Sequence, residues 1–142
     1  MEHCFNNYAL GATSEKNPLI IEERPITTLK QSQNTVWFEF KTLCSPPRSQ
    51  RDYLAIAQKF PIILISHLNA ISSKDESTIY YFIELIDIFY DNHILLILSS
   101  EVPLKEIYPQ GPYAWEFERT LSRLIEMQSE DYLVACHQKL KL

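Results

Sequence analysis

The strongest constraint on the fold is a pattern in the middle of the chain, where two short apolar runs flank an amphipathic segment. The runs are residues 62–66 and 94–99. Uninterrupted apolar runs of this length are typical of strands covered on both faces. Between them, apolar residues recur at helical spacing: Ile79, Phe82, Ile83, Ile86, Phe89 and Tyr90. Strand, helix and strand in this order predict an α/β fold with a right-handed crossover and two parallel strands.

Further helices flank this crossover. Ser49, with Asp52 three residues later, forms a box-like cap for a helix that ends at Pro61, and residues 73–76 predict a capping box for the central helix. A final helix is expected from about residue 112 to 129. Its inward-facing residues are expected to be Phe117, Leu121, Leu124 and Ile125.

The amino-terminal half has a different pattern. Residues 19–21 and 36–40 are β-type runs, and the polar stretch between them suggests a small antiparallel pair. We expect residues 1–17 to be irregular, residues 18–133 to form one α/β module, and residues 134–142 to be a tail.

Composition excludes several classes of protein. With 46% hydrophobic and 22% charged residues the chain should fold, and a net charge of −5 does not support a general nucleic-acid-binding face. No apolar run is long enough to span a bilayer, and the first residues do not form a secretory signal, so we expect a cytoplasmic protein.

The chain contains three widely separated cysteines, Cys4, Cys44 and Cys136. Their odd number and the lack of a C-x-x-C pair predict no disulfide framework. Residues 3–4 and 136–137 each place a Cys next to a His, and these two pairs could meet in the fold as metal ligands. Reduced thiols are favoured, because adjacent residues rarely have the spacing that zinc sites use, and no metal site is expected.

Glycine is scarce, because Gly11 and Gly111 are the only two in the chain. A phosphate-binding P-loop needs two glycines five positions apart, followed by Lys and Ser or Thr, so that backbone amides can cradle the phosphates. Neither glycine has such a partner, and the sequence predicts no P-loop.

In open α/β sheets, ligands bind beyond the carboxyl ends of the parallel strands. The polar residues at or just after the ends of the two runs are Ser66, His67, Asn69, Ser99, Ser100 and Glu101. They could simply terminate the strands, which we favour. Alternatively, His67 could activate Ser99 or Ser100 in a small hydrolase, although no G-x-S-x-G turn surrounds either serine.

Charged and aromatic residues on the helices allow two interpretations. Asp87 fits a solvated carboxylate. The last helix carries charges at i, i+3, i+7 and i+10, namely Glu116, Arg119, Arg123 and Glu126. A surface ion-pair ladder is favoured, but Arg119 and Arg123, like Arg48, could instead bind a phosphate or an acidic partner. For the aromatic residues, among them Trp115, core and interface burial explain the composition equally well.

Six segments resemble one protein family in the family's own order. They are IEERPI around Arg24, FEFKTLC at 38–44, RSQRDY at 48–53, FIELIDIFY at 82–90, SSEVPLKEIY at 99–108 and FERTLSRLIEMQSEDYL at 117–133. The chain resembles the carboxyl-terminal portion of the ZapE-like, AFG-type, AAA+-related P-loop ATPases.

The resemblance implies part of a P-loop ATPase fold. In the full-length family it implies ATP hydrolysis with Mg²⁺ for cell-division or protein-quality-control remodelling, whereas no cofactor is expected in this chain. The positions that match the family pattern, with no catalytic role assigned to any, are Arg48, Asp52, Asp87, Glu101, Arg119 and Arg123. The chain departs from the pattern at Tyr80, Tyr81, His67 and Asn69, which suits a copy without ATPase function.

Three interpretations follow. The first is a carboxyl-terminal ATPase module that is inactive alone. The second is a stand-alone interaction module, which binds a protein partner such as a full-length ATPase of the family or a cell-division protein through Arg119 and Arg123. The small Ser/His hydrolase is the third. The oligomeric state stays open.

Overall fold

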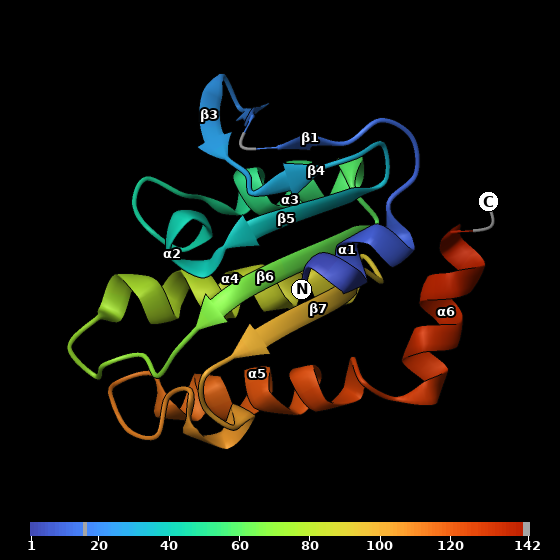
Figure 1. The fold of residues 1–142 in the computed structure, drawn as a ribbon. Helices are drawn as coiled ribbons and strands as arrows, with labels where there is room; N and C mark the ends of the chain where they lie inside the picture. Colours follow the sequence, from blue (N-terminus) through green and yellow to red (C-terminus); the bar gives the residue numbers. More distant parts are fainter. Residues whose placement is uncertain (16, 141–142) are drawn as a thin grey trace.

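The fold is a mixed α/β sandwich built on a five-stranded sheet (Figure 1). A computed structural model describes residues 1–15 and 17–140. The strand order is β1-β4-β5-β6-β7, and β5, β6 and β7 are parallel. Their bounds are Ser14–Glu15 for β1, Lys30–Gln31 for β4, Thr35–Glu39 for β5, Ile62–Leu68 for β6 and Leu95–Ser100 for β7. The predicted α/β class is therefore confirmed.

The predicted crossover is present. Helix α4 (Glu76–Asp91) connects β6 to β7, and these strands pair in parallel. The four residues Ile62–Ile65 are all buried. This agrees with the prediction that the continuous apolar run forms a strand covered on both faces.

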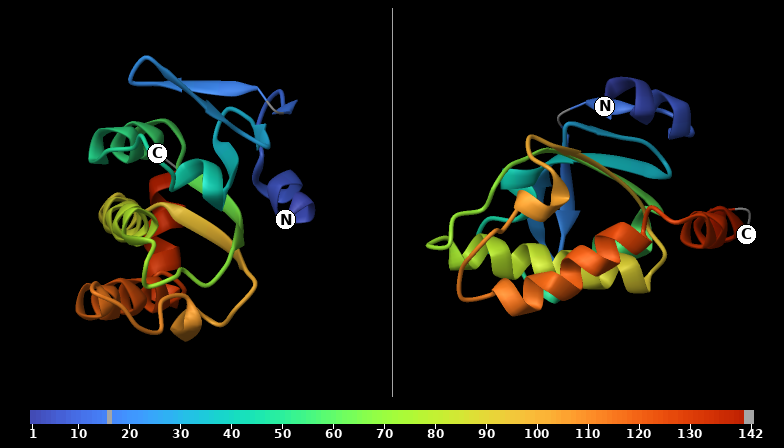
Figure 2. Two further views of the ribbon diagram at one scale, coloured as in Figure 1. Left: turned by 90° about the vertical axis from the view of Figure 1, so that its left-hand side faces the viewer. Right: turned by 90° about the horizontal axis from the view of Figure 1, so that it is seen from below.

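The sheet has unequal cover on its two faces (Figure 2). Helices α3 (Gln50–Lys59), α4 and α5 (Ala114–Glu126) lie on one face, and the short helix α1 (Glu2–Tyr8) lies on the other. Three shorter or peripheral elements complete the chain: α2 (Phe40–Leu43), the 3-10 helix η1 (Leu104–Glu106) and α6 (Glu130–Leu140).

The predicted partners of the first strands were wrong, although an antiparallel pair exists. Strand β2 (Pro18–Ile21) pairs with β3 (Arg24–Thr27), whereas β5 pairs with β4 and β6. The β2–β3 turn places Glu22 and Glu23 at φ 50° and 65°. Two left-handed residues match the twist of a hairpin, but neither is the Gly or Asn that marks such a turn in a sequence.

The two ends of the chain contain more helix than expected. Residues 1–17, expected to be irregular, include α1, whose Phe5 is fully buried with its ring 6.3 Å from that of Trp37. Helix α6 runs through residue 133 to Leu140, so the expected tail is helical up to that point. Residues 141–142 of that tail lie outside the described part.

Helix boundaries differ in detail. The capping box of Ser49 and Asp52 is confirmed. The central helix is capped instead by Asp75, which accepts a hydrogen bond from the Thr78 amide at 3.3 Å. The last predicted helix, expected at about 112–129, corresponds to α5, which ends at Glu126, and α6 follows it as a separate helix. Ile125, expected to face inward, is 54% exposed.

Candidate functional site

The carboxyl edge of the parallel strands holds a histidine–carboxylate pair. His67 lies in the left-handed region, with φ 63°, where the β6–β7 register shifts between Ile65 and Leu68. Such a bulge redirects a side chain. The His67 Nδ1 lies 2.7 Å from Oε2 and 3.0 Å from Oε1 of Glu39, at the end of β5. The sequence interpretation missed Glu39, which the parallel register sets opposite Ser66.

The serines at this edge bond elsewhere. Ser66 accepts a hydrogen bond from Trp37 Nε1 at 3.1 Å, and the Ser100 hydroxyl donates to the Val102 carbonyl at 2.6 Å. Within residues 1–15 and 17–140, no hydrogen bond joins His67 to Ser99 or Ser100. Ser100 therefore bonds a local backbone group, whereas Ser66 bonds a side chain of the neighbouring strand.

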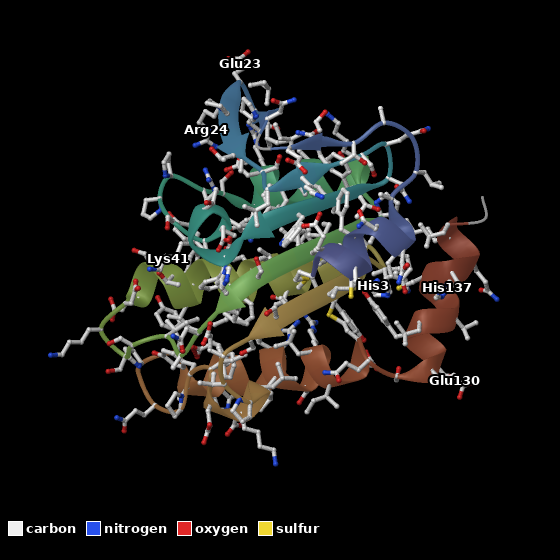
Figure 3. All side chains as sticks on the ribbon, viewed as in Figure 1. His3, Glu23, Arg24, Lys41, Glu130 and His137 are labelled. Atoms are coloured by element: carbon white, nitrogen blue, oxygen red, sulfur yellow. The ribbon has the colours of Figure 1, made fainter. Side chains whose placement is uncertain are left out.

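A cavity of about 360 Å³ adjoins the same edge. It is bordered by Lys41, His67 and Asp75 and reaches Cys44; Figure 3 shows Lys41 at this end of the sheet. Burial raises the pKa of the Cys44 thiol to about 12, so this sulfur stays protonated and is a poor nucleophile at neutral pH. The Cys44 thiol is therefore not an activated nucleophile in this cavity.

Arg48 and Asp52 organise the chain around the start of α3. Asp52 is buried, and both its oxygens accept from Arg24 Nη2 at 2.7 Å, while Oδ2 also accepts from the Ser49 amide at 2.9 Å. Arg48 donates from Nη2 to the Thr42 carbonyl at 2.6 Å. Arg24 lies in the quoted IEERPI segment, yet its partner could not be read from the sequence because Asp52 is 28 residues away.

Asp87 and Arg123 form an ion pair between α4 and α5. Their side chains are 35% and 19% exposed, so Asp87 is not the fully solvated carboxylate that was expected. The Arg123 guanidinium also lies 5.0 Å from the centre of the Tyr90 ring. The neighbouring Glu126 carboxylate raises the pKa of the Tyr90 hydroxyl and keeps it neutral. Arg123 is thus bound across the helix pair, not within a ladder along α5.

A groove runs between α4 and α5, with a volume of about 510 Å³. We call it the α4–α5 groove, and its lining residues are Ile83, Asp87, Trp115, Glu116, Glu118, Arg119, Thr120 and Ser122. Trp115 is 80% exposed. The sequence had left core and interface burial equally open for this residue, and the structure places it on the surface.

The six family-pattern positions do not meet at one centre. Asp87 and Arg119 both line the α4–α5 groove, and Arg123 binds Asp87. Arg48 and Asp52 lie together at the start of α3. Glu101 is exposed beyond β7, where its amide donates to the Leu68 carbonyl at 2.8 Å.

Among the described residues, no three His, Cys, Asp or Glu side chains come together as a metal site, so the cysteines and histidines of the two termini do not assemble one. No helix in this part of the chain combines the length and the apolar character needed to cross a membrane.

Comparison with known proteins gives one family. The sequence profile described as AFG1-like ATPase matches residues 1–136. The chain is 41% identical over 128 residues to the cell division protein ZapE of Escherichia coli strain K12, an overlap that covers 89% of this chain and 34% of that protein. It is 38% identical over 117 residues to an uncharacterized protein of Schizosaccharomyces pombe, an overlap that covers 79% of this chain and 26% of that protein.

A more distant relative is the lactation elevated protein 1 homolog B of Danio rerio, 25% identical over 149 residues, with 82% of this chain and 30% of that protein covered. The chain therefore spans about a third or less of the length of the curated relatives it matches. No solved structure gives a significant match.

Proposed function

Because the chain belongs to the AFG1-like ATPase family, we propose that it is a module of that family which does not hydrolyse ATP alone and acts by binding a protein partner. The partner is a full-length ATPase of the same family or a cell-division protein. The bacterial relative is named as a cell division protein, and we propose the same process, in the cytoplasm, for this chain.

The observation that carries the proposal is the position of the two glycines. Gly11 lies in the turn before β1, at φ 76°. Gly111 lies against Tyr108, and a Cβ atom there would come within 2.0 Å of the Tyr108 hydroxyl. Both glycines therefore serve local packing or turns, and neither joins a strand to a helix as a phosphate loop does.

We further propose that ATP with Mg²⁺ is not bound by this chain alone, because the phosphates of ATP need a cradle of backbone amides. The best-placed polar groups, His67 with Glu39 and Lys41, lie at the carboxyl edge without a glycine cradle beside them. The proposal therefore places ATP and Mg²⁺ in the full-length family and not in this chain.

The test is ATP turnover by the purified chain with Mg²⁺, compared with the same preparation after heat denaturation. We expect equal phosphate release from the two samples. Turnover above the denatured control that is proportional to chain concentration would overturn the inactive part of the proposal.

The partner part is tested separately with the same preparation. The chain is mixed with E. coli ZapE, and co-elution is followed by size-exclusion chromatography. We expect a complex that elutes ahead of either protein alone. Arg123→Glu is unsuitable as a variant for this test because it would set a second carboxylate against Asp87. Separate elution with ZapE and also with cell-division proteins would refute this part.

A further inference from the structure

The α4–α5 groove is lined by an exposed aromatic side chain, Trp115, which has no aromatic, cation–π or hydrogen-bond partner among the described residues. Trp115 is the most exposed of the large apolar residues in the described chain, at 80%. Tryptophan on a protein surface beside a groove is typical of binding sites, since it offers a large contact area with little entropy to lose.

The face of this indole is free of internal cations. In the described residues, the cation–π contacts are made by Lys30, Lys59 and Arg123, none of them to Trp115. Arg119 stands one helical turn from Trp115 yet makes no such contact. A cation from another molecule can therefore occupy the indole face.

The charges around the groove favour a basic occupant. Asp87 is neutralised by Arg123, which lies mostly out of solvent. Two further lining carboxylates, Glu116 and Glu118, are exposed, and neither forms an ion pair within the described part of the chain. Against them stands one exposed guanidinium, that of Arg119. The free charge of the lining is therefore acidic on balance.

We propose that the α4–α5 groove binds a basic amphipathic segment of a protein partner. An apolar side chain of that segment packs against Ile83 and the edge of Trp115. A Lys or Arg of the same segment covers the indole and pairs with Glu118, which lies one turn along α5 on the same side. The inference deepens the partner-binding part of the proposed function and does not depend on ATP turnover.

This assignment reverses the charge expected from the sequence. Arg119 and Arg123 suggested an acidic partner, but Arg123 is held inside the helix pair. Only Arg119 remains available, and it is outnumbered by Glu116 and Glu118.

The probe is a fluorescein-labelled helical peptide of about 14 residues made of Leu and Lys, with a Glu-for-Lys analogue as its counterpart. Binding to the full chain is measured by fluorescence anisotropy. We expect the Lys peptide to bind and the Glu peptide not to bind. Trp115→Ala should weaken binding by at least about ten-fold, since exposed aromatic residues at groove rims act as hot spots.

The matched control separates a site from general attraction to an acidic chain. Glu118→Lys and Glu23→Lys replace one carboxylate by one ammonium each. Figure 3 shows Glu23 at the tip of the β2–β3 hairpin, at the opposite end of the molecule from α5. Both variants change the net charge of the chain equally and should weaken binding of the Lys peptide slightly. Glu118→Lys should weaken it several-fold more than Glu23→Lys does.

Equal losses for Glu118→Lys and Glu23→Lys, unchanged binding by Trp115→Ala, or preference for the Glu peptide would each overturn the inference. If the Lys peptide does not bind but the ZapE complex forms, the groove inference is wrong, and the proposed partner binding must use another surface. If the Lys peptide binds but no ZapE complex forms, the groove inference stands and the proposed partner is wrong.

Discussion

At the scale of single residues, Asp52 combines two structural roles in one side chain. It completes the capping box of α3 and binds Arg24 of the β2–β3 hairpin with both oxygens. Its side chain is only 1% exposed, whereas that of Arg24 is 39% exposed. Loss of Asp52 therefore costs the cap and the charged hydrogen bonds, while Arg24 can still reach water.

Asp52→Ala should lower the free energy of unfolding by about 2–4 kcal/mol, below the cost of a fully buried broken pair because Arg24 is partly solvated. Urea denaturation followed by circular dichroism measures it. The control is Asp75→Ala, which removes only the exposed cap of α4 and should cost about 1 kcal/mol. Equal losses in the two variants would show that the Arg24 contact adds nothing.

The buried thiol of Cys44 makes the stability of the fold depend on pH. Burial raises its pKa from an ordinary 9.0 to about 12, and it also raises that of the neighbouring Tyr53 hydroxyl. Above pH 9 the unfolded chain loses these protons while the folded chain keeps them, so the unfolded state binds fewer protons and stability falls as pH rises.

Stability should therefore decline between about pH 9 and 12, and each such group contributes at most about 1.4 kcal/mol per pH unit. Cys44→Ala should be less stable at pH 7 because it leaves a cavity, but its decline above pH 9 should be shallower. The measurement is urea denaturation at a series of pH values. Parallel curves for the two proteins would exclude Cys44 as a source of the slope.

At the scale of elements, the α4–α5 pair is joined by one charged contact with aromatic support. Arg123 of α5 reaches Asp87 and lies over the Tyr90 ring, both on α4. Arg119, one turn earlier on the same helix, makes neither contact and is exposed. The two arginines differ in environment but not in chemistry, which makes them a matched pair.

Arg123→Ala should destabilise the chain by about 1–2 kcal/mol, the sum of a partly screened ion pair and a cation–π contact. Arg119→Ala should change stability by no more than about 0.5 kcal/mol. Thermal or urea unfolding distinguishes them, and the effect of Arg123→Ala should shrink in the Asp87→Asn background. A loss that is independent of Asp87 would place the contribution in packing on Tyr90 alone.

At the scale of the whole molecule, the sequence predicted those features that depend on residues close together along the chain. The β6-α4-β7 crossover followed from two apolar runs and one helical stripe, and the α3 cap from residues three apart. Pairing over long distances was not accessible: Glu39 meets His67 through the parallel register of β5 and β6, and Arg24 meets Asp52 through the fold of the hairpin. Helix α1 was missed because seven residues with one buried side chain show no periodicity.

The position of β7 has a consequence for the chain in solution. It is the last strand of the sheet, six residues long, and its sequence LLILSS contains neither a charge nor a proline. Within the described part of the chain no strand hydrogen-bonds to its outer edge. Natural proteins protect such edges because they nucleate aggregation. The protein should therefore aggregate faster as it is concentrated, and a lysine near Ile97 would be the first change to make in a preparation that precipitates.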